Sequence, residues 1–575
     1  MEDRRREQWV ERARRWIEAD PDSATRTELQ GLVETGDIDA LADRLDGELE
    51  FGTAGLRGVV GAGSLRMNRA VVIRATRGVA DYLLDVACDA RTLPVIVGYD
   101  ARSSSRQFAE ATAGVLTAAG IPVRYFEQPV PTPLVGYAVR QLGAAAGIVI
   151  TASHNPATYN GYKVFGPDGV QIGPPMDVEV TERIRRVGAA ADVRCDGGVL
   201  DGRSERANPV PVTLFDRYLA DVDVYRSAAS VREIVIVYTP LHGVGWWFVD
   251  AAFRRAGYPP LHVVPEQRDP DGEFPTAPFP NPEEPGVLDR AIALAGEVGA
   301  DLLLANDPDA DRLSICVPTP SRRWVQLSGN QVGLLLADFV LSRVARQPTP
   351  LVVSTIVSSP LLEVLAQAHG ARCERTLTGF KWICRAGLAL QAETAGRFVF
   401  GYEEAHGYAI PVVHDKDGIS AALLFADLVA DCKAAGRSVR ERLDDLYREH
   451  GLWVSYPKTV VLSGGAGAAQ IEVAMERLRS DPPAELGGLP VEGSLDYAVT
   501  AERPIWRGVA NLVELQLRGG SRVFVRPSGT EPKLKVYTEL RAPRGAGKDV
   551  REQETLALED AAAVSNAVVE YVGLV

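Results

Sequence analysis

The stretch TASHNPATYNGYKVF, residues 151–165, follows the apolar run GIVI at residues 147–150. The run predicts a short buried strand, and the Ser, His, Asn, Pro and Gly residues after it are typical of a loop. Ser153 is therefore expected at the end of a strand, where ligands collect in open α/β sheets. No GxSxG motif surrounds it, and an extended loop would point Ser153 and His154 in different directions. These two residues are thus not expected to bond to each other as nucleophile and base.

A second stretch, ANDPDADRLSI at residues 305–315, also follows a strand-like run. Asp307, Asp309 and Asp311 alternate, so an extended backbone would place their carboxylates on one side. Crowded carboxylates favour a hard cation such as Mg²⁺. A calcium loop of the EF-hand type is excluded, because Gly is missing at its sixth position and Glu at its twelfth. A solvated acidic turn remains the alternative.

A third stretch, RVFVRPSGTEPKLKVYTEL at residues 522–540, predicts two strands around a turn. Arg526 offers a planar fork of donors, Ser528 and Thr530 offer hydroxyls, and Gly529 lets backbone N–H groups approach an anion. The turn is therefore a candidate phosphate cradle. The nucleotide-loop motif GxxxxGK[ST] is absent from the chain, and a plain hairpin turn remains the alternative.

Together these stretches resemble the α-D-phosphohexomutase family, which includes phosphoglucomutases and phosphomannomutases. Four loops of that family occur in its order, and the resemblance runs from about residue 45 to about residue 540. The four loops are TASHNP (151–156), DPDADR (307–312), GYEEAHGY (401–408) and RPSGTEP (526–532), supported by FGTAGLRG (51–58), PLHGVG (240–245) and TLTGFKW (376–382). The strings FGTAGLRG, VPEQRDPDGEFPT and NPEEPGVL resemble most the long-chain branch that handles hexose and pentose phosphates.

The resemblance implies an α/β fold, with three mixed-sheet α/β domains of similar βαβ arrangement and a C-terminal α+β domain around a central cleft. A length of 575 residues also suggests about four domains. The expected domains are a phosphoserine-bearing domain with an N-terminal helix, a metal-binding domain, a sugar-binding domain and a phosphate-binding domain. Their expected bounds are 1–205, 206–320, 321–452 and 453–575.

Hydrophobic periodicity predicts individual elements of these domains. Trp9, Ala13 and Trp16 recur at helical spacing and predict an amphipathic N-terminal helix. The proline-rich residues 257–286 are expected to be extended. Further helices are expected over 105–119, 214–222, 287–298, 331–344, 361–369, 468–479 and 554–573, and strands over 94–99, 122–126, 233–238, 301–305, 350–356, 397–401 and 456–462.

The resemblance also implies a reaction, in which phosphorylated Ser153 gives its phosphoryl group to a sugar monophosphate and recovers another from the resulting bisphosphate. It implies Mg²⁺ on Asp307, Asp309 and Asp311, with a phosphoserine oxygen of Ser153 as the fourth ligand. A hexose 1,6-bisphosphate is expected as activator.

A general base must take the proton of the attacking hydroxyl. Lys163, Lys381 and His154 are the candidates, and the resemblance favours the two lysines; an electrostatic contact to phosphate is the alternative for each lysine. Arg57 and Arg312 are expected to contact phosphoserine or substrate phosphate, with ordinary surface salt bridges as the alternative.

The sugar loop departs from the pattern of many hexose-specific relatives. Glu403 and Glu404 are expected to accept hydrogen bonds from ring hydroxyls. Where those relatives carry a serine, this chain has Ala405. The resemblance therefore does not imply an enzyme that discriminates strictly between glucose and mannose phosphates, and pentose phosphates remain candidate substrates. His406 either takes over the lost polar role or packs.

Bulk properties narrow the class of protein. The net charge of −14 argues against a nucleic-acid-binding surface. Six scattered cysteines without a CxxC motif indicate neither a zinc site nor a disulfide framework, so a cytoplasmic location is expected. Acidic residues among the N-terminal arginines argue against a transit peptide, and no run approaches the ~20 apolar residues of a membrane span. The expected partner is a small-molecule sugar phosphate, with no nucleic acid and no membrane, and the chain is expected to be a monomer or homodimer.

The leading functional hypothesis is a phosphosugar mutase that interconverts the 1-phosphate and 6-phosphate of glucose or mannose. A phosphopentomutase or a sugar 1,6-bisphosphate synthase is the alternative within the family. A non-catalytic phosphosugar-binding protein is the alternative from another class, and the intact Ser153, aspartates and Arg526 argue against it. A phosphatase would need water at the phosphoenzyme, which a closing cleft would disfavour.

Overall fold

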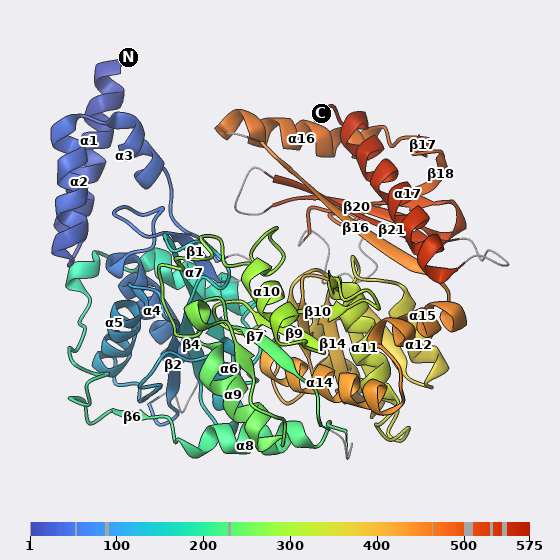
Figure 1. Cartoon of the computed structure of the whole chain (residues 1–575). Helices are drawn as coiled ribbons and strands as arrows, with labels where there is room; N and C mark the ends of the chain where they lie inside the picture. Colours follow the sequence, from blue (N-terminus) through green and yellow to red (C-terminus); the bar gives the residue numbers. More distant parts are fainter. Residues whose placement is uncertain are drawn as a thin grey trace. The chain divides into compact units, whose positions relative to one another are not determined.

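The computed structural model forms two compact units, which we describe separately (Figure 1). Unit 1 comprises residues 1–327 and 407–431, and unit 2 comprises residues 328–406 and 432–575. The described residues are 2–51, 55–86, 91–227, 232–462, 464–499, 510–528, 533–542 and 549–574.

Unit 1 begins with three helices that pack on one another. They are α1 (Glu2–Ala19), α2 (Ser23–Thr35) and α3 (Ile38–Leu45). Asp22 caps the start of α2, because its side chain accepts a hydrogen bond from the backbone N–H of Ala24. Trp9 and Ala13 of α1 are buried in the apolar cluster that the three helices share, which confirms the predicted amphipathic helix. Trp16 packs partly buried against this cluster and against the core of the following domain.

The first sheet of unit 1 is mixed and has six strands in the order β1-β5-β4-β2-β3-β6. The strands β2, β3, β4 and β6 are parallel, whereas β5 returns antiparallel to β4 directly after the serine loop. Figure 1 shows helices on both sides of the sheet, with α5 on one and α6 on the other. The elements are β1 (Leu56–Val59), α4 (Arg69–Val86), β2 (Val95–Tyr99), α5 (Ser105–Ala118), β3 (Val123–Tyr125), α6 (Thr132–Gln141), β4 (Ala146–Ile150), β5 (Tyr159–Phe165), α7 (Met176–Arg186), η1 (Ala190–Asp192) and β6 (Ala207–Pro209).

The second sheet of unit 1 is also mixed and has five strands in the order β11-β10-β9-β7-β8. The strands β7, β8 and β9 are parallel, and β9 and β10 form an antiparallel hairpin around the aspartate loop. The elements are α8 (Thr213–Asp223), β7 (Ile236–Thr239), α9 (Gly245–Arg255), β8 (His262–Val263), η2 (Pro265–Gln267), α10 (Asp289–Glu297), β9 (Leu302–Asn306), β10 (Leu313–Pro318) and β11 (Trp324–Gln326).

A later segment of the chain, residues 407–431, completes unit 1. It contains β15 (Gly407–Ala409) and most of α14 (Gly418–Ala434). Polar contacts hold it to both sheet domains. His414 Nδ1 donates to the carbonyl of Asp168 at 2.7 Å, and the hydroxyl of Tyr218 donates to Asp417 at 2.7 Å. These contacts bring the connection after the sugar loop beside the aspartate loop.

Unit 2 combines a parallel sheet with an antiparallel one. The parallel strands lie in the order β13-β12-β14, and the six antiparallel strands in the order β16-β21-β20-β19-β18-β17. The first group comprises α11 (Gly329–Leu341), β12 (Pro350–Thr355), α12 (Leu361–Ala368), β13 (Arg372–Thr376), α13 (Phe380–Thr394), β14 (Arg397–Glu403) and α15 (Val439–His450). The second comprises β16 (Trp453–Val461), α16 (Gly464–Ser480), β17 (Glu485–Leu486), β18 (Leu489–Asp496), β19 (Val513–Leu517), η4 (Arg518–Gly520), β20 (Arg522–Pro527), β21 (Lys533–Arg541) and α17 (Val550–Tyr571).

The predicted α/β class is confirmed. The helices and strands expected from periodicity are present with ends shifted by a few residues, as for α16, which begins at Gly464 rather than near 468. The proline-rich residues 257–286 hold only β8 and η2, as an extended path predicts. In the part of the chain that is described, no helix is both long and apolar enough to cross a bilayer.

Candidate active site

Ser153 lies in the loop after β4 and has a left-handed backbone, with φ of 52°. This conformation is uncommon for residues other than glycine and clusters at functional sites. The side chain is buried, and its Oγ donates to Asp307 Oδ2 at 2.7 Å. The backbone N–H of Ser153 donates to Thr151 Oγ1 at 2.9 Å. The loop therefore presents the hydroxyl directly to the aspartate loop of the neighbouring sheet.

One expectation about this loop was wrong. Ser153 Oγ lies 3.2 Å from His154 Nδ1, within hydrogen-bond distance, although adjacent residues on an extended loop would point apart. The positive φ at Ser153 turns the chain and brings the two side chains together. Burial, then Arg312 and Arg57, hold the pKa of His154 well below its ordinary value, so its imidazole is neutral near pH 7.

The serine loop is held by Arg102, which sequence reasoning missed. Arg102 is buried, and its Nε bonds to Asp100 Oδ2 at 3.1 Å. Its guanidinium donates to three backbone carbonyls of the loop, those of Ser153 (2.7 Å), Asn155 (2.6 Å) and Pro156 (2.6 Å), and to that of Tyr159 (3.0 Å) at the start of β5. Only the fork of an arginine supplies so many donors in one plane. Arg102 is thus a positioning residue for Ser153.

We expect Arg102→Met to lower kcat about 100-fold with a smaller change in KM, because a misplaced reacting group costs about that much in rate. Methionine fills much of the volume but leaves four carbonyls without their donor. Steady-state kinetics and thermal unfolding measure the effect. Arg106→Met, at an exposed arginine paired with Asp201, is the matched control. A kcat equal to that of the control would show that the loop keeps its shape without Arg102.

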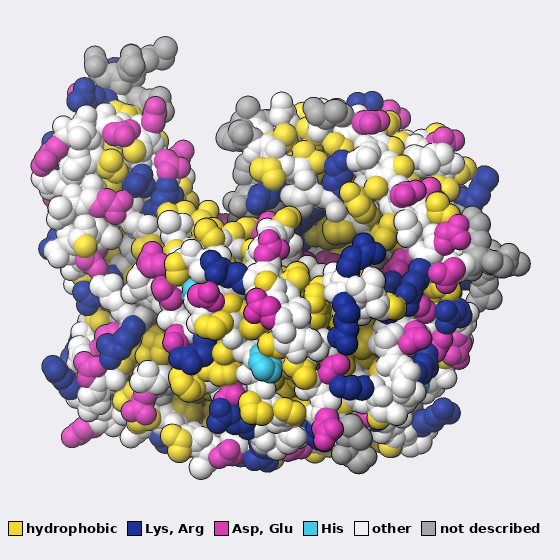
Figure 2. Space-filling view, viewed as in Figure 1, with side chains coloured by type: hydrophobic (Ala, Val, Ile, Leu, Met, Phe, Trp, Pro, Cys, Tyr) yellow, Lys and Arg dark blue, Asp and Glu magenta, His cyan; other side chains and the backbone are white. Residues whose placement is uncertain are grey.

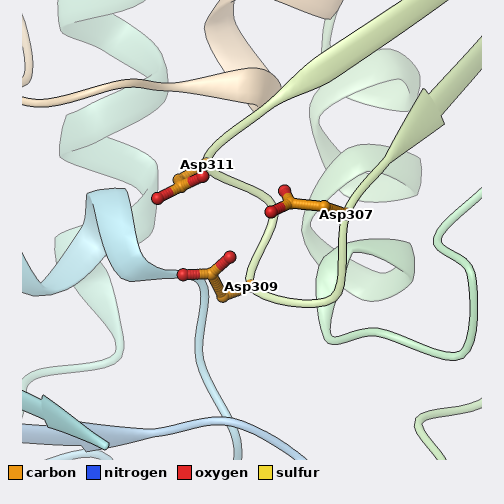
Figure 3. Close-up of side chains that lie close together, drawn as sticks. All are labelled: Asp307, Asp309 and Asp311. Carbon is orange, nitrogen blue, oxygen red and sulfur yellow. The ribbon is translucent and has the colours of Figure 1, made fainter. Parts of the chain in front are cut away.

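Asp307, Asp309 and Asp311 converge, but not for the reason that alternation suggested. The loop between β9 and β10 is a turn rather than extended backbone, and Ala310 has a positive φ of 52°. One carboxylate oxygen from each aspartate lies within 4.8 Å of the others, and all three residues are buried. Figure 3 shows the three carboxylates turned toward a common space. The turn, rather than a shared strand face, gathers them.

Neighbouring residues fix the shape of the aspartate loop. Asn306 at the end of β9 accepts from the hydroxyl of Tyr238 at 2.9 Å and donates to the carbonyl of Arg312 at 2.5 Å. The start of α14 packs against the same residues, so closely that a Cβ at Gly418 would lie 2.4 Å from Asn306 Nδ2. Only glycine allows this approach. The carboxylates are therefore preorganised by groups outside the aspartate triplet.

The three carboxylates fit a hard divalent cation. Lys163 Nζ donates to Asp309 Oδ2 at 2.8 Å and to Asp311 Oδ2 at 3.0 Å. The other oxygens of these two residues, Asp309 Oδ1 and Asp311 Oδ1, are buried and have no hydrogen-bond partner among the described residues. Buried polar atoms in native proteins are nearly always paired. Two unpaired carboxylate oxygens beside Asp307 and Ser153 are the ligand chemistry that a metal ion requires.

The charges around the triplet are unequal. Burial, followed by the neighbouring carboxylates Asp309 and Asp311, raises the pKa of Asp307 well above its ordinary value. Burial opposes ionisation of Asp309 and Asp311 too, but the ammonium of Lys163 holds the pKa of both below the ordinary value. The same ion pairs outweigh the burial of Lys163 and raise its pKa. Lys163 is thus a cation in this arrangement, whereas a general base must be neutral.

The remaining predicted residues of unit 1 lie close to this centre. Arg57 on β1 donates to Asn155 Oδ1 at 2.7 Å. Burial lowers the pKa of Arg57, although the nearby carboxylates of Asp309 and Asp311 oppose that shift. The backbone N–H of Arg312 donates to Asp307 Oδ1 at 3.0 Å. The structure thus brings together the predicted residues Arg57, Ser153, His154, Lys163, Asp307, Asp309, Asp311 and Arg312.

Two further residues of this centre, Asp415 and Lys416, were missed. Lys416 Nζ lies 3.4 Å from Asp311 Oδ2 and 3.6 Å from Asp415 Oδ1. Gln171 donates to Asp415 Oδ2 at 3.1 Å. The alternating charges of HDKDG at residues 414–418, in an otherwise apolar stretch, were the available signal.

The predicted sugar-binding residues lie in unit 2. Glu404 Oε2 accepts from Thr355 Oγ1 at 2.9 Å, and Glu403 is buried at the end of β14. The loop passes so close to α11 that a Cβ at Gly329 would lie 1.8 Å from the carbonyl oxygen of Glu404. His406 is buried with φ of 56°.

Lys381, the other candidate base, is also in unit 2, in the first turn of α13. Its Nζ lies 5.9 Å from the ring centre of Trp382.

The predicted phosphate cradle is only partly described. Strands β20 and β21 pair antiparallel, as predicted, and Arg526 Nη2 donates to the hydroxyl of Tyr537 at 3.2 Å. Burial opposes the charge of Arg526, but Tyr537, Glu404 and Glu403 keep its pKa above the ordinary value. The backbone N–H of Ser528 bonds to the carbonyl of Lys533 at 2.8 Å. Gly529 and Thr530, also predicted for this site, lie outside the described residues.

Comparisons with known proteins agree with this geometry. Four domain models of phosphoglucomutase/phosphomannomutase match the chain, the α/β/α domains I, II and III at residues 48–190, 215–320 and 328–450 and the C-terminal domain at 491–557. A probable phosphomannomutase of Haemophilus influenzae is 37% identical over 86% of this chain and 96% of its own length. The human phosphopentomutase is 35% identical, over 92% and 91%. The human glucose 1,6-bisphosphate synthase is 33% identical, over 95% and 92%.

A solved structure shares the fold. The crystal structure of a putative phosphomannomutase from Thermus thermophilus matches with a TM-score of 0.67 and 24% identity, over 92% of this chain and 99% of that chain. The four domain models match in order, and models I and II include the serine and aspartate loops of unit 1. Relatives align over nearly the whole length of the chain. The chain therefore belongs to the phosphoglucomutase/phosphomannomutase family, the α-D-phosphohexomutases, and is an enzyme of the phosphomutase type.

Proposed function

We propose that this enzyme is a phosphosugar mutase that moves a phosphoryl group between the 1-position and the terminal hydroxyl of a sugar, with Ser153 as the phosphoryl carrier. The observation that carries the proposal is the 2.7 Å bond between Ser153 Oγ and Asp307 Oδ2 in a buried cluster of three carboxylates. A phosphate dianion on Ser153 needs a cation beside it, and these carboxylates would hold that cation. Glucose and mannose phosphates are the leading substrates.

In the first half-reaction, the free hydroxyl of a sugar monophosphate attacks the phosphorus of phosphorylated Ser153. The new O–P bond forms as the P–Oγ bond breaks, the hydroxyl proton passes to a base, and the departing Ser153 Oγ takes up a proton in exchange. Phosphoryl transfer of this kind depends on positioning and charge neutralisation more than on covalent help. In the second half-reaction, the other phosphate of the bisphosphate returns to Ser153, so the enzyme regains its phosphate and no net phosphate is used.

The chain's own residues divide this work. Arg102 holds the carrier loop through its carbonyls, and Arg57 lies beside that loop at Asn155. Asp307, Asp309 and Asp311 would hold Mg²⁺, which supplies Lewis-acid polarisation of the phosphoryl oxygens when bound. Lys163, or Lys381 of unit 2, takes the proton. Lys163 can accept the proton only in its neutral form, so its ion pairs with Asp309 and Asp311 must be broken first.

We further propose that unit 2 recognises the sugar. Glu403 and Glu404 accept hydrogen bonds from ring hydroxyls, and Arg526, with Ser528, Gly529 and Thr530, binds the phosphate that is not reacting. The support is that Arg526 Nε is buried without a hydrogen-bond partner among the described residues, and that Glu403 and Glu404 are near enough to raise the pKa of Arg526. A phosphate oxygen would accept a hydrogen bond from that nitrogen.

We expect Arg526→Ala to raise KM strongly and also to slow turnover, because a charge-assisted fork to phosphate contributes about 1.5–3 kcal/mol. Initial rates over a range of sugar phosphate concentrations measure this loss. Arg526→Lys is the matched control, since it keeps the charge and loses the fork, and an intermediate KM is expected. Kinetics of Arg526→Ala equal to those of the wild type would remove the cradle from substrate binding.

A second candidate function is the mutase reaction on pentose phosphates, or the synthesis of a sugar 1,6-bisphosphate. Ala405 favours it, because it lacks the hydroxyl that many hexose-specific relatives place in the sugar loop. Two human relatives are a phosphopentomutase and a glucose 1,6-bisphosphate synthase, which supports the same candidate. We propose that the enzyme accepts both sugar classes.

We expect a relaxed substrate range that includes at least one pentose phosphate. Side-by-side assays of glucose, mannose, ribose and glucosamine phosphates, with glucose 1,6-bisphosphate as primer, test both the class of reaction and the substrate. Discrimination above roughly 10⁴ usually needs buried polar groups that read a hydroxyl, so a larger kcat/KM ratio of glucose over ribose contradicts this prediction. Ala405→Ser is the matched variant, and it should increase the preference for hexose. No turnover with any of the four would contradict the mutase proposal itself.

A further inference from the structure

A cavity of about 540 Å³ lies within unit 1, where the N-terminal helices meet the first sheet domain. Its lining comes from five places: α1, the end of α3 with the turn after it, the loop before α4 at Ser64, the helix α4, and the segment between α7 and the start of η1. None of the lining residues belongs to the candidate active site. The volume falls in the range of about 300–1,000 Å³ that small-molecule sites occupy.

The lining carries more positive than negative charge. It includes Arg12, Arg15 and Arg74 but, as its acidic member, only Glu48. Arg74 Nη1 donates to Glu48 Oε1 at 2.9 Å. Arg12 and Arg15 form ion pairs with exposed carboxylates outside the lining. Exposed pairs of this kind contribute little and exchange easily. On the face that Figure 2 shows, basic and acidic side chains are interspersed, and the chain as a whole has a net charge of −14. The lining itself thus carries more positive than negative charge, in contrast to the net charge of the whole chain.

Two donors on the side chains that form this wall have no acceptor. Trp16 Nε1 and Arg74 Nε are buried and make no hydrogen bond among the described residues. A buried donor without a partner destabilises the folded state, and native proteins rarely leave one unpaired. A carboxylate or phosphate oxygen accepts from two or more donors at once. Both atoms are closed off from the cavity as the side chains stand, so pairing with a bound anion requires each side chain to rotate toward it.

Most of the remaining lining is apolar. It includes Leu45, Ala70, Val187 and the indole of Trp16, with Ser64 as a polar member. Such a wall favours an organic body over a bare inorganic ion, because removing apolar surface from water is favourable.

We propose that this cavity is a second binding site, separate from the active site, for a small organic anion. Its phosphate or carboxylate group accepts from the guanidinium groups of Arg12, Arg15 and Arg74, and its apolar body packs against the indole of Trp16, Leu45 and Val187. Because the lining joins α1 to α4, a bound anion ties the N-terminal helices to the first sheet domain. A ligand that binds only the folded state raises the free energy of unfolding by mass action.

The binding test uses the full chain labelled with 5-fluorotryptophan, in which the ¹⁹F resonance of Trp16 is assigned by its loss in Trp16→Phe. Phenyl phosphate and benzoate are the probes, and benzyl alcohol is the neutral control of similar shape. We expect a saturable shift of the Trp16 resonance with the anions and none with the alcohol. The probe that saturates at lower concentration distinguishes a phosphate from a carboxylate ligand. Because Trp16 is remote from the catalytic residues in sequence and contacts, anion binding at the active site does not produce this signal.

Variants test whether the arginines do the binding. Arg74→Gln should weaken the anion at least 10-fold, which corresponds to about 1.4 kcal/mol. Arg14→Gln, at an exposed arginine on the same helix α1 but outside the lining, is the matched control and should bind normally. If Arg74→Gln does not fold, the double variant Arg12→Gln, Arg15→Gln replaces it, since both side chains are largely exposed. The absence of a saturable shift with both anions, an equal shift with benzyl alcohol, or unchanged affinity in the arginine variants overturns the proposal.

Discussion

Ser153→Ala is expected to reduce mutase turnover to near background while the fold is retained. The substitution removes one oxygen, the Oγ that donates to Asp307 at 2.7 Å, and leaves the Arg102 contacts to the loop backbone in place. Without a carrier oxygen, a sugar monophosphate has no enzyme phosphate to receive, and the bisphosphate cannot form. The effect follows from stoichiometry and does not depend on which sugar is the substrate. Initial rates with a primed sugar 1-phosphate measure it.

The phosphate itself can be located. Purified enzyme should contain a subpopulation that is heavier by one phosphate, on the peptide that spans Ser153, and incubation with a hexose 1,6-bisphosphate should increase that fraction. Dephosphorylated enzyme should need the bisphosphate as activator. Ser103→Ala, at an exposed serine of a neighbouring loop, is the matched control and should keep both the phosphate and the activity. A phosphate on another residue, or near-normal turnover of Ser153→Ala, would end the carrier role of Ser153 and leave a binding protein as the better explanation.

The class of fold was predictable because it depends on local patterns that repeat. Apolar runs of four to six residues mark the buried strands β2, β4, β9 and β12, and the loop composition after β4 and β9 marks where side chains are presented. The helix α1 was predictable from three residues, because Trp9, Ala13 and Trp16 recur at helical spacing. The ends of α11 and α16 differ by a few residues from the expected ones, since caps and tertiary packing decide where a helix ends.

The geometry within the loops was not predictable from alternation or adjacency. The aspartates converge through a turn at Ala310, and Ser153 meets His154 through a left-handed backbone, and neither conformation has a sequence signature in residues other than glycine. Both predictions treated the loops as extended strands. The prediction that three carboxylates converge was right, although the reason for it was wrong. The prediction that Ser153 and His154 point apart was wrong.

Residues that act on a distant part of the chain were the ones missed. Arg102 belongs to the loop after β2, yet the four carbonyls that it binds lie in the serine loop that follows β4 and at the start of β5. Lys416 reaches Asp311 from a segment that follows the sugar loop. A single arginine or lysine carries no periodicity, so only the folded chain shows what it contacts. The orphan donors Trp16 Nε1 and Arg74 Nε are the same kind of information, because an unpaired atom has meaning only in a packed structure.

Removal of divalent metal with a chelator is expected to abolish activity, and Mg²⁺ is expected to restore it. Asp309→Asn should weaken this restoration, so that far more Mg²⁺ is needed and kcat falls at least 100-fold. Asparagine has the same shape, but it replaces one oxygen of a carboxylate whose Oδ2 accepts from Lys163 and whose Oδ1 has no partner among the described residues. Loss of a group that merely orients a metal ligand already costs about 10–100-fold, and loss of a ligand should cost more.

The control for this substitution is Asp269→Asn, at an exposed aspartate paired with Arg268, which should leave the Mg²⁺ requirement unchanged. Direct titration of Mg²⁺ into each variant, followed by calorimetry, gives a measure of binding that does not depend on turnover. Thermal unfolding shows whether Asp309→Asn keeps its fold, and the fold should be kept because the change removes one of three crowded negative charges. Normal Mg²⁺ binding with undiminished turnover in Asp309→Asn would mean that the loop is structural. In that case Lys163 and Lys416, which already lie 3.0 and 3.4 Å from Asp311, would be the cations that neutralise it.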